Sequence, residues 1–290
     1  MKVYCILSDE RAFHSRSPVM FSTVLRRQGI NAVYVPFMVT PPNLGQAIAG
    51  LRVLNIAGAN VTAPFKETII PHLDALSEGA RIIGSINTIV RDGDRLKGYN
   101  TNAIGIMDAL RSLDYIVEDK SALVFGTGGA ARTVAFILNW LRAREVWVAG
   151  RNIERARDIV KEFNGRAIDS ASLNGLRLPC ALIINATSVS SPEESGDLAG
   201  LAEKLDTPFC ELVIDLNYGR RRNFWQEMAD RKGIRFMDGL NPLAFQACRT
   251  LELWTGVKVP PQEFLNALNP YSAFYEFVSF DDLAKCHWMR

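Results

Sequence analysis

The chain has few of the residues that build metal centres and disulfide frameworks. Its 290 residues include only five cysteines and three histidines, and no two cysteines form a C-x-x-C pair. An odd number of widely spaced cysteines predicts buried free thiols rather than a disulfide network, and the histidines show no ligand spacing. We therefore expect neither a structural disulfide nor a metal site.

A strong charge of one sign and long apolar runs are also lacking. Lys and Arg total 33 and Asp and Glu total 31, which leaves a formal charge of +2. So small a surplus predicts no dedicated nucleic-acid surface. No apolar run approaches the ~18 residues of a membrane span, and the first residues are typical of a β-strand rather than a signal sequence. These features predict a cytoplasmic protein with no nucleic-acid or membrane partner.

The sequence does contain a regular alternation of short apolar strands and helical segments. This pattern is typical of βαβ units and predicts an α/β fold. In the first part of the chain we predict strands at 2–8, 33–39, 56–61 and 85–90, helices from Ser17-Pro18 to Gly29 and from Pro64 to Leu76, and a hairpin at Asp92-Gly93. In the second part we predict a strand from Ser121 and others at 145–149, 181–186, 212–216 and 234–237, with helices at 133–142, 153–163, 222–232 and 242–255.

The pattern changes near residue 103, which predicts two domains. Residues 104–239 resemble a complete Rossmann dinucleotide-binding domain. The last helix has no strand partner there, so we expect it to return to the first domain. The predicted fold therefore has a discontinuous substrate-binding domain, 1–103 plus 240–290, whose aromatic tail at 270–290 is expected to pack back on it.

A glycine loop follows the strand at Ser121. Residues 126–131 read Gly-Thr-Gly-Gly-Ala-Ala and fit G-x-G-x-x-A between a strand and a helix, where the backbone can approach a pyrophosphate. The next strand ends in Gly150-Arg151-Asn152, with Arg155 one helical turn on, and no acidic residue stands at its tip. Arginine suits a 2′-phosphate, so the sequence favours NADP over NAD. A solvated helix start remains an alternative for both arginines.

Polar clusters mark three places in the first domain. They are the segments His14–Pro18, Asn60–Lys66, and the pair Asn87-Thr88 with Tyr99–Asn102. The two serines of the first cluster suit a carboxylate at a helix start. Each cluster alone also has a structural explanation, because serines cap helices and asparagines make turns.

Taken together, these clusters resemble the shikimate dehydrogenase family. The motifs H-S-x-S-P, N-V-T-x-P-F-K, N-T and G-x-N-T precede the glycine loop in that order, and the likeness continues through Asn185–Ser188, Asp215–Tyr218, Asp238-Gly239 and Phe245–Ala247. The resemblance covers about residues 3–268. It implies an N-terminal substrate domain that the C-terminal helices join, with a Rossmann domain between them in the chain. It also implies NADPH-dependent reduction of 3-dehydroshikimate to shikimate, or action on a related ring acid.

The resemblance also implies a role for each matching residue. Lys66 would be the catalytic lysine, and the substrate carboxylate would be held by Ser15 and Ser17. The ring would be bound by Asn60, Thr62, Asn87, Thr101 and Gln246, with Tyr218 lining the same pocket. The cofactor would be held by Gly126, Gly128, Gly129, Ala130, Arg151, Asn152, Arg155, Thr187 and Gly239. No metal is implied, and the protein would be a monomer or homodimer.

The sequence departs from the family at one catalytic position. The family motif is G-x-N-T-D, whereas this chain has Asn102 in place of the aspartate that pairs with the lysine. An amide keeps the shape and hydrogen-bonding capacity but carries no proton or negative charge. Three readings stay open: Lys66 works without a carboxylate, the enzyme acts on a quinate- or aminoshikimate-type ring, or the chain binds the ligand without turning it over.

Overall fold

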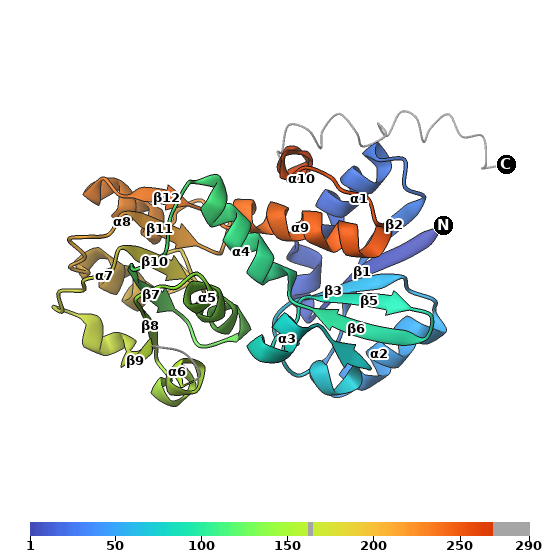
Figure 1. Ribbon diagram of the computed structural model, residues 1–290, viewed down its shortest axis with the longest axis horizontal. Helices are drawn as coiled ribbons and strands as arrows, with labels where there is room; N and C mark the ends of the chain where they lie inside the picture. Colours follow the sequence, from blue (N-terminus) through green and yellow to red (C-terminus); the bar gives the residue numbers. More distant parts are fainter. Residues whose placement is uncertain (162–164, 269–290) are drawn as a thin grey trace.

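The computed structural model describes residues 1–161 and 165–268, and in these residues the strands form two six-stranded sheets (Figure 1). The first sheet consists, in spatial order, of β2 (Ala32–Met38), β1 (Lys2–Ser8), β3 (Gly58–Val61), β5 (Thr88–Asp92), β6 (Arg95–Tyr99) and β4 (Ala75–Leu76). Strands β2, β1 and β3 are parallel, while β5 runs antiparallel to both of its neighbours. The hairpin predicted at Asp92-Gly93 is confirmed, because it joins β5 to β6.

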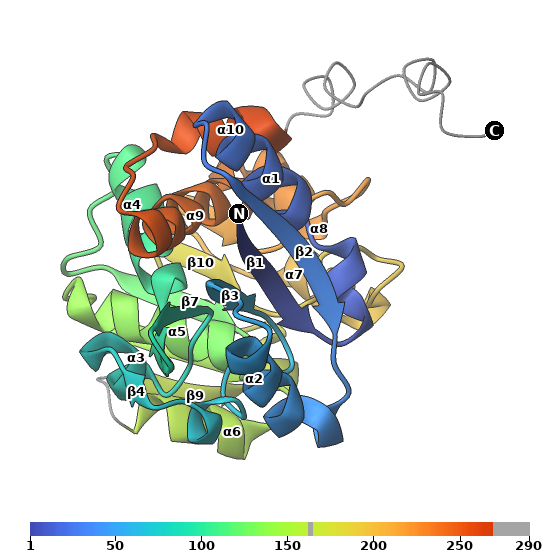
Figure 2. The ribbon, with the colours of Figure 1, turned by 90° about the vertical axis from the view of Figure 1, so that its right-hand side faces the viewer.

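Helices cover both faces of the first sheet. One face packs against α1 (Ser17–Arg27), α9 (Leu240–Thr255) and α10 (Pro261–Leu268) in a core that includes Tyr4, Phe21 and Trp254. The other face packs against α2 (Leu44–Val53) and Phe65. The last two helices of the described residues, α9 and α10, thus lie on the first sheet, as Figure 2 shows from the side.

The second sheet is parallel throughout. Its spatial order is β12 (Arg235–Met237), β11 (Leu212–Asp215), β10 (Leu182–Asn185), β7 (Ser121–Phe125), β8 (Glu145–Gly150) and β9 (Gly165–Asp169). Counted from β7 as strand one, this order is 6-5-4-1-2-3, which defines the Rossmann fold. The predicted α/β fold, with a substrate-type sheet and a Rossmann sheet, is confirmed.

The Rossmann sheet is also covered on both faces. One core contains residues from α4 (Thr101–Ser112), α5 (Gly129–Trp140) and α6 (Ile153–Val160), and the other contains residues from α7 (Gly196–Lys204) and α8 (Phe224–Lys232). The remaining helices are α3 (Glu78–Ile83) and the 3-10 helices η1 (Glu10–His14), η2 (Pro41–Asn43), η3 (Ile70–His72) and η4 (Ser170–Leu173).

Helices α4 and α9 pack side by side between the two sheets (Figure 1). Their close approach requires glycine at position 105, because a Cβ there would lie 2.6 Å from the carbonyl oxygen of Pro242 and 2.8 Å from the Cβ of Gln246. α4 begins among the predicted substrate residues and ends in the Rossmann core, so it connects the two sheets.

One predicted helix is wrong. The segment from Pro64 to Leu76 forms turns, the short η3 and β4 instead of an α-helix, and the peptide bond before Pro64 is cis. The carbonyl of Lys66 accepts a hydrogen bond from the N–H of Ile86 over 2.8 Å, and Pro71 has no N–H for a helical bond. A tertiary bond thus engages the Lys66 carbonyl, and the segment keeps only short local bonds, such as that from the Ile69 N–H to the Phe65 carbonyl over 3.1 Å.

Other predictions differ only at their ends or lie partly outside the described residues. Helix α9 ends at Gly256, whose left-handed conformation with φ 74° closes it as predicted. Ser17 is the first residue of α1 rather than its cap, which is Arg16. The predicted helix at 153–163 is observed to Val160, and its last two residues and the tail at 270–290 lie outside the described part of the chain.

Candidate active site

Loops from the two sheets meet around the start of α4. Asn100 caps this helix and donates from Nδ2 to the hydroxyl of Thr133 on α5 over 3.1 Å. The first residue of α5 is also close to the first domain, because a Cβ on Gly129 would lie 2.7 Å from the hydroxyl oxygen of Ser85. The glycine loop of the Rossmann sheet therefore lies directly against the loop that precedes β5.

Asn87 connects the predicted substrate residues of three separate segments. The two hydrogens of its Nδ2 are shared among three acceptors, the Thr101 hydroxyl at 2.8 Å, Asn102 Oδ1 at 3.1 Å and Gln246 Oε1 at 3.1 Å. Its Oδ1 accepts from the main-chain N–H of Thr101 over 2.6 Å. The structure thus brings together four of the predicted residues, although Gln246 is 159 positions away from Asn87 along the chain.

Two of the predicted ring-binding side chains are engaged inside the protein. Asn60 accepts from the Tyr34 hydroxyl over 2.8 Å and donates to the carbonyl of Asn87 and the hydroxyl of Thr88. The Thr101 hydroxyl, which is fully buried, lies 3.0 Å from the hydroxyls of both Thr88 and Thr250. These contacts position the neighbouring groups, and direct binding of a ring by Asn60 or Thr101 stays a prediction.

Sequence reasoning missed two members of this network, Tyr34 and Thr250, and it named Thr88 in a polar cluster without giving it a role. Tyr34 lies within a predicted strand, Thr88 next to Asn87, and Thr250 one helical turn after Gln246. The spacing of four between Gln246 and Thr250 is the only signal that places the last one on the same helix face.

The two serines of the first cluster lie next to Tyr218. The Ser15 hydroxyl accepts from the main-chain N–H of Ser17 over 3.2 Å, and the Ser17 hydroxyl is hydrogen-bonded to Tyr34. The phenolic oxygen of Tyr218 is hydrogen-bonded to the main chain of Arg16, and burial raises the pKa of this phenol. Residues after β1 and after β11 therefore face each other, which is the arrangement expected if they hold one ligand.

Lys66 and Thr62 lie in the turn that follows β3. The bond from Ile86 to the carbonyl of Lys66 places this residue beside the loop that carries Asn87. Lys66 is half-buried, and burial lowers its pKa to about 8 because the charged form loses hydration. An amine with such a pKa exists in both forms near neutral pH, so it can donate or accept a proton. Thr62 is half-buried nearby.

The glycine loop leaves room for an anion at the start of α5. Gly126 has φ 119°, and a Cβ on it would lie 2.9 Å from the carbonyl oxygen of Ala186, so glycine is required there. A Cβ on Gly128, the residue that precedes α5, would meet nothing within 4 Å, and no side chain caps the helix. The free N–H groups of the first turn, which begins with Gly129 and Ala130, therefore suit a pyrophosphate.

The residues after β8 are exposed and cationic. Asn152 caps α6 by accepting from the N–H of Arg155 over 3.0 Å, so its oxygen is already engaged. Within the described residues, the guanidinium groups of Arg151 and Arg155 have no ion-pair partner, whereas Arg157 on the same helix pairs with Glu154. The two unpaired guanidinium groups suit a phosphate beyond the strand tip.

Thr187 and Gly239 follow strands β10 and β12. The Thr187 hydroxyl donates to Asn185 Oδ1 over 2.7 Å, which fixes the loop after β10. Gly239 precedes α9, and its N–H donates to the carbonyl of Asn217 over 3.0 Å. Both residues lie at the carboxyl edge of the Rossmann sheet, where dinucleotides bind in this fold.

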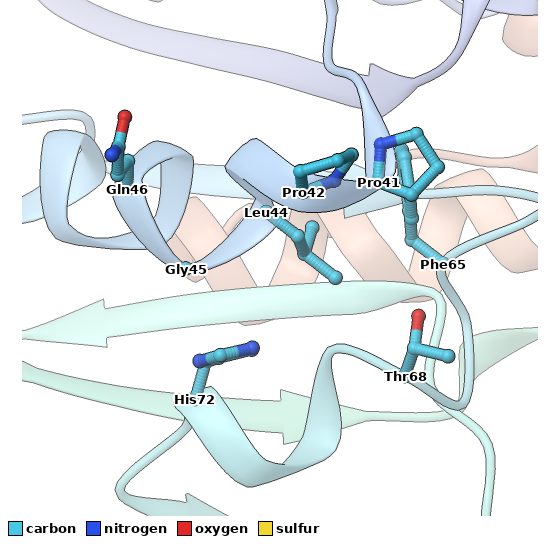
Figure 3. A pocket seen from close by; sticks show the side chains of 8 residues that line it. All are labelled: Pro41, Pro42, Leu44, Gly45, Gln46, Phe65, Thr68 and His72. Carbon is cyan, nitrogen blue, oxygen red and sulfur yellow. The ribbon is translucent and has the colours of Figure 1, made fainter.

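A separate hollow lies between the start of α2 and the turns that follow β3. Its volume is about 520 Å³, and its lining consists of Pro41, Pro42, Leu44, Gly45, Gln46, Phe65, Thr68 and His72 (Figure 3). None of the predicted site residues contributes to it. In the described parts of the chain, no three His, Cys, Asp or Glu side chains are grouped to hold a metal ion, and no helix is long and apolar enough to cross a membrane.

A Rossmann sheet with an open phosphate site, set against a polar site that contains a lysine of lowered pKa, defines a two-domain dinucleotide-binding protein of the oxidoreductase type. Residues 10–89 match the profile of the shikimate dehydrogenase substrate binding domain, and residues 109–220 match that of shikimate / quinate 5-dehydrogenase. The chain belongs to the shikimate dehydrogenase family, which confirms the resemblance seen in the sequence.

Individual relatives agree with this assignment. The chain is 36% identical to shikimate dehydrogenase (NADP(+)) of Desulforamulus reducens over 265 residues, which is 88% of this chain and 91% of that protein. The structure resembles shikimate dehydrogenase of Aquifex aeolicus with a TM-score of 0.83 and 31% identity, covering 93% of this chain and 98% of the other. It also resembles the Thermus thermophilus enzyme in complex with NADP(H) and shikimate, with a TM-score of 0.81, 31% identity and coverage of 92% and 98%.

Proposed function

We propose that this protein is an NADP-dependent dehydrogenase that reduces 3-dehydroshikimate to shikimate. The network centred on Asn87 carries the proposal, because it assembles Thr101, Asn102 and Gln246 from distant segments beside the turn that holds Lys66. Relatives over nearly the whole chain are named shikimate dehydrogenase (NADP(+)), and one similar structure holds NADP(H) and shikimate.

The residues present fit NADP. The uncapped start of α5, reached through Gly126 and Gly128, would take the pyrophosphate. The unpaired Arg151 and Arg155 would take the 2′-phosphate, and Thr187 and Gly239 would flank the rest of the cofactor. Bound NADPH supplies the hydride that converts the ring ketone into an alcohol.

On the substrate side, Ser15 and Ser17 would hold the carboxylate, close to Tyr218. Asn87 and Gln246, supported by Asn60, Thr62 and Thr101, would orient the ring. Lys66 would donate a proton from Nζ to the ketone oxygen as the C–O bond becomes single, and it would take the proton back in the reverse direction. Asn102 orients the ring but transfers no proton, because an amide does not ionise in this range.

We also propose the domain boundaries that the sequence predicts, with 104–239 as the cofactor domain and 1–103 plus 240–290 as the substrate domain. The packing of α9 and α10 on the first sheet supports them. The cytoplasmic location, the monomeric or homodimeric state and the lack of a nucleic-acid partner stay predictions.

Two alternative functions would also account for Asn102 in place of the family's aspartate. In the first, the protein is a paralogue that acts on a quinate- or aminoshikimate-type ring. In the second, it binds the ring acid without turning it over. One experiment separates the three: NADP and NAD are each supplied with shikimate, quinate and aminoshikimate while nicotinamide absorbance is followed, and binding is measured by calorimetry. Turnover of shikimate supports the proposal, turnover of another ring alone supports the paralogue, and saturable binding of shikimate without any turnover supports the binder.

A further inference from the structure

The hydrogen bonds of Asn87 fix the orientation of its own amide. The main-chain N–H of Thr101 lies 2.6 Å from Asn87 Oδ1, and the main-chain N–H of Asn102 lies 3.3 Å from it. A main-chain N–H can only donate, so the atom of Asn87 that faces the first turn of α4 has to be the oxygen. The nitrogen of the same amide therefore faces the other way.

The nitrogen of Asn87 in turn fixes two further amides. It lies 3.1 Å from Asn102 Oδ1 and 3.1 Å from Gln246 Oε1. If either amide were reversed, its NH₂ group would face the NH₂ group of Asn87, donor against donor. The Gln246 oxygen also accepts from the Thr101 hydroxyl over 3.1 Å. The carbonyl oxygens of Asn102 and Gln246 are thus both turned toward the protein.

The nitrogen atoms of these two amides are left for a ligand. Within the described residues, neither Asn102 Nδ2 nor Gln246 Nε2 has a hydrogen-bond partner, and Asn102 is partly exposed. These two NH₂ groups make this edge of the site a row of donors. An aspartate at position 102 would offer a second carboxylate oxygen, which only accepts.

We propose that Asn102 makes this edge of the site a hydrogen-bond donor surface, so that the ring oxygen opposite it is bound as a ketone in preference to a hydroxyl. The inference rests on the proposed function, since it concerns the same ring acid. A ketone oxygen only accepts, whereas a hydroxyl that faces these two NH₂ groups finds no acceptor among them for its own proton. An unpaired buried donor lowers affinity by about tenfold or more.

The test compares the dissociation constants of 3-dehydroshikimate with NADP⁺ and of shikimate with NADPH, two complexes that cannot react. Calorimetry is carried out near neutral pH on the wild type, on Asn102→Asp and on the surface control Asn139→Asp, which adds the same charge on an exposed residue of α5. The preference for the ketone is the dissociation constant of shikimate divided by that of 3-dehydroshikimate. We expect this ratio to fall by at least about tenfold in Asn102→Asp and to stay unchanged in Asn139→Asp.

The negative charge that Asn102→Asp adds acts alike on the carboxylates of both acids, so its effect largely cancels in the ratio of the two dissociation constants. An unchanged ratio in Asn102→Asp, with both acids bound, would overturn the inference and leave the proposed function intact.

A second measurement needs no ligand. In the free protein, NMR is expected to show rapid exchange with water for the side-chain NH₂ of Asn102 and protection for that of Asn87, with signals assigned by their loss in Asn102→Asp and Asn87→Asp. The reverse pattern would overturn the inference. The expected pattern in a protein that binds neither acid would overturn the proposed function instead.

Discussion

The main-chain carbonyl of Lys66 accepts a hydrogen bond from the N–H of Ile86 over 2.8 Å. This bond ties the turn that carries the lysine to the loop that carries Asn87, and it forms without the helix that the sequence predicts. Because burial lowers the pKa of Lys66 to about 8, the site holds an amine that can act in either protonation state.

Removal of the Lys66 amine is expected to abolish most of the turnover. Lys66→Met should lower kcat with the best ring substrate at least about 100-fold, the lower end of a general acid–base contribution, while NADP affinity stays unchanged. The matched control is Lys97→Met, which replaces an exposed lysine of β6. Turnover of Lys66→Met within about threefold of the wild type would show that the lysine has another role.

The same substitution should not destabilise the fold. Folding lowers the pKa of Lys66 to about 8 from the value of 10.5 in the unfolded chain, so burial of the charged amine opposes folding. This penalty is fully present below pH 8 and is relieved as the pH rises from 8 to 10.5. Lys66→Met is therefore expected to match or exceed the wild-type free energy of unfolding at neutral pH in urea denaturation. A large loss of stability would mean that the charged amine is held by contacts in the fold.

The pH dependence of the reaction should follow the titration of Lys66. Oxidation of shikimate requires the neutral amine, so kcat/KM for shikimate is expected to rise with pH up to about 8 and then level off. Reduction of the ketone requires the ammonium form and should fall over the same range. In Asn102→Asp the added carboxylate stabilises the ammonium, so both transitions should move to higher pH. Profiles that are flat around pH 8 in the wild type would contradict this role.

The cofactor preference should depend on Arg151. Arg151→Ala is expected to weaken NADP binding about 10- to 100-fold, because a hydrogen bond to a charged group contributes ~1.5–3 kcal/mol, and to leave NAD binding nearly unchanged. Arg157→Ala is the control, since this arginine is paired with Glu154. Equal wild-type affinities for NADP and NAD in calorimetry would show that no 2′-phosphate site exists here.

An acid at position 102 should improve turnover of shikimate. Asn102→Asp is expected to raise kcat on shikimate at least about tenfold, with a smaller change in KM, because the carboxylate shares the proton of Lys66 mainly in the transition state. Steady-state kinetics on the wild type and on Asn102→Asp test this expectation. A slower Asn102→Asp, combined with brisk wild-type turnover of another ring acid, would mean that Asn102 is an adaptation to that substrate.

The supporting role of Tyr34 can be tested through stability. Tyr34→Phe removes the donor to Asn60 Oδ1, and an unpaired buried acceptor should cost ~1–3 kcal/mol of unfolding free energy. Tyr99→Phe, on a half-buried tyrosine of β6, serves as the control. Equal unfolding midpoints for Tyr34→Phe and the wild type would show that the Asn60 amide finds another partner.

Local patterns in the sequence were sufficient for most of the Rossmann half of the fold, although β9 and α7 were not predicted. The strand, glycine loop and helix at residues 121–140 depend on neighbours in the chain, and so does the end of α9 at Gly256. The resemblance to the family also implied that Asn87, Thr101 and Gln246 bind one ring. Periodicity and turn chemistry act over a few residues, so they can be read without the tertiary structure.

The geometry of the site was decided only by tertiary contacts. The segment around Lys66 has a helical pattern. The main-chain carbonyl of Lys66 instead accepts from the N–H of Ile86, 20 positions away, and the helix does not form. The orientation of the Asn102 amide follows from Asn87, which is itself fixed by the first turn of α4. Hydrogen bonds between distant segments form only when the sheets and helices have packed, because the gain from each bond depends on excluding water from both partners.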